Sequence, residues 1–193
     1  MNFSFAPPLV SFDPIDLGDL NQCLTDWGHK MGPWLRPSYG DDWFFGMRHN
    51  GQLVAVTASC ALMTPRCAAG LSRTEAFELG RVCAAAPDWC RAILRLWRMT
   101  VYPALCATRG YQWAISYQDA VLHRGDLYRH DGWVRLAFSR GASSTDPRTG
   151  RKGRDKWVWG WHPDPLVRRL ARMDEAVAAA IEARLESRRE ALS

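Results

Sequence analysis

The sequence predicts an α/β or α+β protein with a mixed, V-shaped central sheet flanked by helices. Short apolar runs with the two-residue alternation of strands occur between longer stretches whose apolar residues recur every three or four positions. Asn50 and Gly51 join two strand-like runs, which indicates a β-hairpin. Alternation of strands and helices along the whole chain suits a mixed sheet with helices against it.

The individual elements follow from spacing, turn residues and helix-capping residues. Asp13 followed by Pro14 predicts one helix start, and Asp88 predicts another. Gly110 is expected to end the second helix, which continues through Pro103. The predicted elements are an edge strand over 2–12, a helix over 13–30, a hairpin over 42–62, a strand over 74–86, a helix over 88–110, a strand over 111–117, a short helix within 123–134, strands over 133–140 and 156–161, and a helix from 163 onward.

Length and composition indicate one domain and a C-terminal appendage. With 193 residues, 47% of them hydrophobic, the chain can bury one sizeable core, which we assign to residues 1–162. Residues 163–193 have an apolar stripe at helical spacing and equal numbers of acids and bases. We expect this amphipathic helix to pack on the domain or on a second copy, which would make a homodimer.

Charge and cysteine usage narrow the class of partner and the location. Only three of the 25 cationic residues are lysine, and arginine suits bidentate phosphate contacts, although a G+C-rich genome would also raise its share. The six cysteines form no CxxC pair, which indicates free thiols in a reducing cytoplasm and no zinc site. No apolar run reaches the roughly 18 residues of a membrane span, so no membrane partner is expected.

Two resemblances rest on short motifs in the second half of the chain. In LYRHDGW, Tyr128 precedes Gly132 and Trp133, which resembles the fourth-helix pattern of the GNAT acyltransferases. More narrowly, FELGRV and SYQDAVLHRGDLYRHDGW, within about residues 75–162, resemble the Mom family of phage DNA-modification proteins. The matching positions are Glu78, Leu79, Arg81, Ser116, Tyr117, Asp119, His123, Gly125, Tyr128, Gly132 and Trp133.

The resemblance implies a transferase that adds an acyl-derived group to a nucleobase amine in phage DNA and so protects it from restriction in the bacterial cytoplasm. The donor would be acetyl-CoA or another acyl-CoA, and Tyr128 would protonate the departing thiolate. Two alternatives stay open: an N-acyltransferase of a small amine or a protein, and a non-catalytic DNA-binding or host-defence-blocking protein.

Acyl transfer to an amine requires a base and an acid near the acyl carbonyl. Asp119 or His123, at the turn after a predicted strand, would take the amine proton in a hollow shared with Tyr128, while Glu78 is a base by resemblance. The alternatives are that Asp119 caps the following helix, His123 lies on the surface and Glu78 forms a structural ion pair.

Two further catalytic candidates are weaker. Tyr117 continues the alternation of Trp113 and Ile115, so a core position competes with a catalytic one. Ser116 faces the other way from Tyr117, and no histidine is assured beside it as an activating base.

The donor-binding region departs from the GNAT pattern. The usual pyrophosphate loop is absent, and AAAPDWCRA stands in its place. The free amides of the following helix start could still bind a phosphate, with Asp88 opposing an anion. The candidate cofactor-binding residues are Val82, Cys83, Trp89, Cys90, Arg91 and Arg95.

A glycine-containing basic loop over 140–156 indicates double-stranded DNA as a partner. Such a loop can lie on a phosphate backbone, and a tryptophan beside it can stack on a displaced base, although a solvated loop beside core tryptophans is the alternative. The candidate nucleic-acid-binding residues are Arg81, Arg140, Arg148, Arg151, Lys152, Arg154, Lys156 and Trp157. No metal site is expected, because no ligand spacing typical of one occurs.

Overall fold

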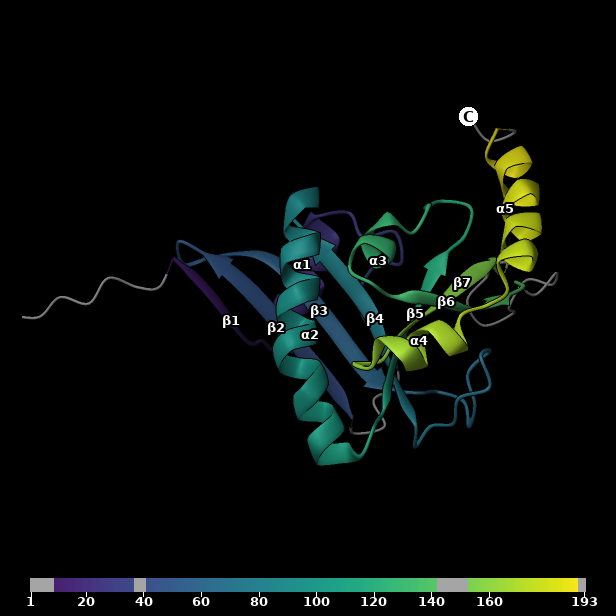
Figure 1. The fold of residues 1–193 in the computed structure, drawn as a ribbon. Coiled ribbons are helices and arrows are strands. Elements are labelled where there is room, and N and C mark those ends of the chain that lie inside the picture. The colour runs from purple at the N-terminus through teal and green to yellow at the C-terminus, as the bar shows by residue number, and fades with distance from the viewer. Residues whose placement is uncertain (1–8, 37–40, 142–152, 191–193) are drawn as a thin grey trace, which may run out of the picture. The chain divides into compact units, whose positions relative to one another are not determined.

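The computed structural model describes residues 9–36, 41–141 and 153–190. Seven strands form one mixed sheet in the order β1-β2-β3-β4-β5-β7-β6, which confirms the predicted fold class (Figure 1). The chain divides into two compact units, Met1–Ala61 with Leu79–Gly110, and Leu62–Glu78 with Tyr111–Ser193. Strand β4 (Ala76–Ala84) contributes three residues to the second unit and the remainder to the first.

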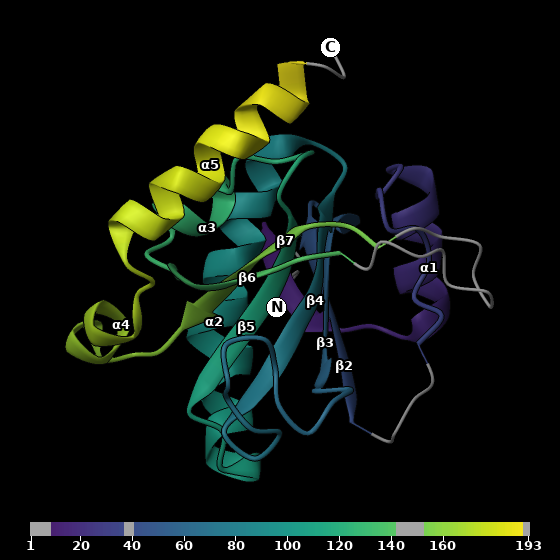
Figure 2. The ribbon, with the colours of Figure 1, turned by 90° about the vertical axis from the view of Figure 1, so that its right-hand side faces the viewer.

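The first unit has helices on both faces of its strands (Figure 2). Helix α1 packs on Val56, Ala58 and Cys60, whereas α2 packs on the face that carries Ala55 and Met47. Because side chains alternate along a strand, these two sets belong to opposite faces. The elements are β1 (Val10–Pro14), α1 (Leu17–Asp26), β2 (Asp42–His49), β3 (Gln52–Ala61), most of β4 and α2 (Pro87–Arg109).

Turn and capping residues explain most boundaries in this unit. Asn50 and Gly51 have positive φ values of 49° and 79° and close the β2–β3 hairpin, as predicted. Gly110, with a φ of 75°, ends α2, and Pro103 does not break that helix.

Both predicted N-caps in this unit are wrong. Asp13 lies in β1, where it pairs with Gly46, and α1 is capped instead by Asp16, which accepts a 2.7 Å hydrogen bond from the Asp19 amide. The N-cap of α2 is Ala86, two residues before the predicted Asp88, so Asp88 lies in the first turn of the helix.

The second unit is built on the antiparallel set β5-β7-β6. Val158 on β7 packs with Ile115 and Trp113 on β5 and with Cys67 and Leu62 from the segment before β4. The first residues of β4 pair with β5 in parallel. The elements are β5 (Trp113–Asp119), α3 (Asp126–His130), β6 (Val134–Ser139), β7 (Lys156–Trp161), α4 (Pro165–Ala171) and α5 (Glu175–Glu190).

The predicted C-terminal helix is present as α5, but the prediction of one unbroken helix from residue 163 is wrong. Arg172 has extended backbone with a ψ of 134°, which ends α4. Asp174 then accepts hydrogen bonds of 2.9 Å and 3.0 Å from the amides of Ala176 and Val177 and so caps α5. In the described part of the chain, no helix is both long enough and apolar enough to cross a membrane.

Candidate active site

The phenol of Tyr128 is held beside β5 by a hydroxyl partner and two tryptophans. Its Oη lies 2.7 Å from Ser116 Oγ, and Ser116 is buried on β5. The Tyr128 ring stacks on Trp159 at 5.7 Å between centroids and meets the edge of Trp133 at 5.3 Å. The tyrosine is half-buried, and its hydroxyl is oriented by the buried Ser116.

Gly125 lets the chain enter α3 against Trp159. Its φ is 82°, a conformation that other residues adopt only with strain. A Cβ at this position would also overlap the Trp159 ring and come within 2.6 Å of Gln118 Oε1. Glycine is therefore required for Tyr128 to reach Ser116.

Gln118 links the strand, the loop after it and the aromatic group. Its Oε1 accepts a 2.7 Å hydrogen bond from Trp159 Nε1, and its Nε2 donates to the carbonyl oxygen of His123 at 2.5 Å. These two bonds fix Trp159, on which Tyr128 stacks, relative to the β5–α3 loop.

Asp119 does not converge on Tyr128, so the expected shared hollow is wrong. Alternation along β5 places Asp119 and Tyr117 on the face opposite Ser116 and Gln118. Asp119 Oδ1 accepts 3.0 Å hydrogen bonds from the amides of Val121 and Leu122, and Oδ2 lies 3.3 Å from an Arg154 nitrogen. The carboxylate therefore holds the turn after β5 and does not cap α3, whose N-cap is Gly125.

The other catalytic candidates are dispersed. Tyr117 Oη accepts a long 3.4 Å hydrogen bond from the Ala68 amide, and Lys156 Nζ lies 5.7 Å from its ring centroid. Glu78 is buried opposite Ile115, and so on the Tyr117 face. His123 is exposed at the β5–α3 loop.

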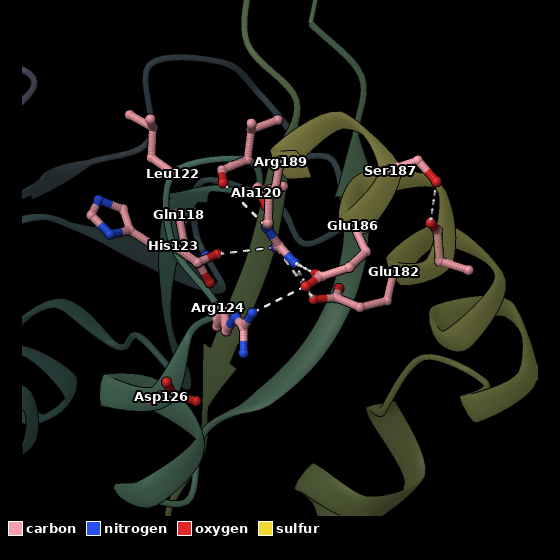
Figure 3. Close-up of polar contacts among 12 residues, drawn as sticks. Gln118, Ala120, Leu122, His123, Arg124, Asp126, Glu182, Glu186, Ser187 and Arg189 are labelled. Atoms are coloured by element: carbon pink, nitrogen blue, oxygen red, sulfur yellow. Dashed lines mark hydrogen bonds and ion pairs between the residues drawn. The ribbon is translucent and has the colours of Figure 1, made fainter. Parts of the chain in front are cut away.

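Helix α5 holds the β5–α3 loop through one arginine (Figure 3). Arg189 donates to the carbonyl oxygens of Ala120 at 2.6 Å and Val121 at 3.2 Å. Its guanidinium also lies 2.6 Å from Glu186 Oε2, and Arg124 from the loop pairs with the same glutamate at 3.0 Å. The helix thus positions the loop that leads into Tyr128, a role that no sequence motif indicated.

The candidate nucleic-acid residues divide by burial. Arg140 and Arg154 are exposed and Lys156 is half-buried. Trp157 is fully buried, and Arg81 is buried with its guanidinium 5.2 Å from the Trp34 ring centroid. Neither of these two is placed to touch a nucleic acid, and Arg148, Arg151 and Lys152 lie outside the described residues.

Among the described residues, no group of three or more His, Cys, Asp or Glu side chains is arranged to hold a metal ion.

The comparisons with known proteins concern the fold. No protein-family model matches the sequence, and no curated protein matches it. A probable acetyltransferase from Staphylococcus epidermidis ATCC 12228 superposes with a TM-score of 0.56 at 10% identity, over 80% of this chain and 99% of that one. Arabidopsis thaliana NAA60 with a bisubstrate analogue gives 0.56 at 13% identity, and the aminoglycoside 6'-N-acetyltransferase from Enterococcus faecium gives 0.50 at 11%, each over 80% and 99% of the two chains.

The chain has the GNAT fold. At identities of 10–13% the match concerns the fold, and nothing in it points to the narrower Mom family.

The start of α2 is where a GNAT-fold protein is expected, by the resemblance, to hold a donor pyrophosphate. Ala86 caps this helix without a side-chain hydrogen bond, and Pro87 follows it, so side chains leave the helix start open. Arg91 and Arg95 are exposed one turn apart, which favours an anion, and exposed Asp88 opposes one. The helix start is therefore open to a pyrophosphate, and two of the three charged residues near it favour an anion.

The remaining cofactor candidates are apolar side chains and thiols that pack near the start of α2. Val82 and Trp89 belong to the apolar cluster around Ile93, and the Trp89 ring lies 5.1 Å from His49. Burial and the neighbouring Cys90 raise the pKa of Cys83 to about 11, and burial also raises the pKa of Cys90. Both thiols are therefore protonated near neutral pH and unsuited to nucleophilic catalysis.

Proposed function

We propose that this protein is an acyltransferase that moves an acyl-derived group from an acyl-CoA to an amine. The observation that carries the proposal is the Tyr128–Ser116 pair, an oriented and half-buried phenol that lies beside β5 in a GNAT fold. A bound acyl-CoA would supply a thioester. The expected donor residues are those at the start of α2.

Tyr128 is the proposed acid. Its Oη holds a proton that it can give to a leaving thiolate, and Ser116 Oγ can then donate a hydrogen bond to the resulting phenolate. Trp159 and Trp133 fix the ring, so little ordering is left for the reaction itself. His123, exposed on the loop that leads to Tyr128, is the proposed base. Asp119 is already engaged by two amides and Arg154, and Glu78 lies on the opposite face of the sheet from Ser116 and Tyr128.

For the acceptor we propose an amine of a nucleobase in double-stranded DNA, modified in the cytoplasm of a phage-infected bacterium. The support is the Mom-like motif around Tyr128 and the exposed cations Arg140 and Arg154 beside β6 and β7. A small amine or a protein is the second candidate acceptor, favoured by the fold likeness to an aminoglycoside 6'-N-acetyltransferase and to NAA60.

The test is to express the wild-type protein and Tyr128→Phe in bacteria and to analyse digested DNA by mass spectrometry. We expect a nucleoside with added mass in wild-type samples only. In parallel, purified protein is mixed with acetyl-CoA and either duplex DNA, an aminoglycoside, a polyamine or a peptide amine, and thiol release is followed. Release with an amine other than DNA identifies the second candidate, and no release with any acceptor overturns acyl transfer.

A further inference from the structure

A basic hollow lies between helix α5 and the ends of β6 and β7. Its volume is about 170 Å³. It is separate from the Tyr128–Ser116 pair and shares no lining residue with it. The residues that line it are Phe138, Arg140, Asp155, Ile181, Arg184, Leu185 and Arg188.

The hollow has an apolar floor. Ile181 and Leu185 are buried on α5, and the half-buried Phe138 ring meets the edge of Trp157 with centroids 4.8 Å apart. The α5 residues 181, 184, 185 and 188 recur at helical spacing, so the helix presents its apolar stripe and two arginines to the same side. A flat or apolar part of a ligand can rest on this floor.

The rim carries three guanidinium groups and one carboxylate. Asp155 already forms an ion pair with Arg188 and accepts a 2.9 Å hydrogen bond from the Gly141 amide. Within residues 9–36, 41–141 and 153–190, no ion pair is found for Arg140 or Arg184. Both arginines are exposed at the rim of the apolar floor.

Asp155 stays ionised, and its negative charge offsets only one of the three positive charges of the rim. Burial acts to raise the pKa of Asp155, but the hydrogen bonds from Gly141 and Arg188 and the charges of Arg188 and Arg140 outweigh it and hold the pKa below its usual value. Three positive charges against one negative charge leave a net charge of +2.

We propose that this hollow binds a nucleotide, with its phosphate between Arg140 and Arg184 and its base or sugar against Phe138. Arginine forks bind phosphate oxygens in pairs, and an aromatic floor accepts a base of any sequence. The nucleotide can come from a nucleic-acid strand or from a free nucleotide. Only the first source rests on the proposed DNA acceptor, in which case the hollow anchors the strand away from the reacting base.

The test uses fluorescence anisotropy without any acyl donor, so that its outcome is independent of acyl transfer. The probes are a labelled 20-base-pair duplex and a labelled AMP, each with inorganic phosphate as a competitor. The variants are the double substitution Arg140→Gln with Arg184→Gln and, as a matched control, Arg169→Gln, which removes an exposed arginine from α4 outside the hollow.

We expect the double variant to weaken binding about tenfold for the probe that binds, and to lower the slope of log Kd against log salt by about 2 for the duplex. Arg169→Gln should change Kd less than twofold. Tight binding of the duplex alone identifies a strand as the source, and binding of AMP identifies a free nucleotide. Equal weakening in both variants, or no binding of either probe to the wild type, would overturn the proposal.

Discussion

The two faces of β5 differ in what they do, although their residues alternate within one motif. On one face, Ser116 and Gln118 hold Tyr128 and Trp159 by hydrogen bonds of 2.7 Å. On the other, Asp119 holds a turn and an arginine. The comparison teaches that neighbouring polar residues in a strand motif serve separate purposes, because each step along the strand reverses the face.

The largest expected effect is on kcat, and it should differ between substitutions of Tyr128 and of Tyr117. Tyr128→Phe should lower kcat about a hundredfold or more, because it removes the proposed acid. Its effect on the free energy of unfolding should be about 1 kcal/mol, the worth of one hydrogen bond. Thiol release with the best acceptor measures the rate, and urea unfolding measures the stability.

Tyr117→Phe is the matched control for this experiment. It removes the same atom from the opposite face, where the hydroxyl accepts a long 3.4 Å hydrogen bond from the Ala68 amide. We expect kcat to stay within about threefold of the wild type. A larger loss in Tyr117→Phe than in Tyr128→Phe would move the acid to the other face of β5.

The next largest effect should come from the entry into α3. Gly125→Ala combines a positive φ with a Cβ that would overlap Trp159, so we expect a loss of about 2–5 kcal/mol in the free energy of unfolding. Gly132→Ala has a similar φ of 80°, but its nearest atom would be 3.4 Å away, in the Trp161 ring. It should lose only about 1–2 kcal/mol. Equal losses would mean that packing against Trp159 contributes nothing.

Asp119→Ala should affect stability more than catalysis. It removes the acceptor of two amide hydrogen bonds and an ion pair, so we expect a loss of about 1–2 kcal/mol. Asp126→Ala removes a carboxylate from an exposed pair with Arg129 at 3.7 Å and should lose under about 1 kcal/mol. If folded Asp119→Ala loses kcat about as much as Tyr128→Phe, Asp119 takes part in catalysis as well as holding the turn.

Local signals were enough to predict the fold but only part of the site. Asn50-Gly51, Gly110 and the two-residue alternation are short-range features, and the hairpin, the end of α2 and the central strands lie where they indicated. The α1 cap differs from the prediction because Asp16 competes with Asp13, and β1 pairing extends to Pro14. The α2 cap differs because Ala86, which has no capping side chain, precedes Pro87 at the helix start.

Contacts between residues far apart in the chain could not be predicted from the sequence. The motif placed Tyr128 near β5, but its contacts with Ser116 and Trp159 depend on Gly125 and on β7 pairing with β5. Alternation places Asp119 and Ser116 on opposite faces of β5, but it does not say which face Tyr128 of α3 contacts, and only the Ser116–Tyr128 hydrogen bond shows that. Arg189 reaches carbonyl oxygens 68 and 69 positions away, and no local pattern encodes such a contact.

The smallest expected effect is on the pH dependence of stability, through Glu186 in the ion pairs that join α5 to the β5–α3 loop. The hydrogen bond from Arg189 outweighs burial and, with the charges of Arg124 and Arg189, lowers the pKa of Glu186 from its ordinary 4.5. A carboxyl with a lowered folded pKa contributes stability that is present above its unfolded pKa and is lost as pH falls through the folded value.

The wild-type midpoint of urea unfolding should therefore fall more steeply than that of Glu186→Gln as pH is lowered from 5 to 3. Asp155, whose pKa is also lowered, is present in both proteins, so the difference between the two curves isolates Glu186. At pH 7 the variant should be slightly less stable, since the amide keeps one hydrogen bond to Arg189 but not the charge that also pairs with Arg124. Parallel curves from pH 7 to 3 would show that the ion pairs of Glu186 add nothing to holding α5 on the loop, and Arg189 would then act through its carbonyl contacts alone.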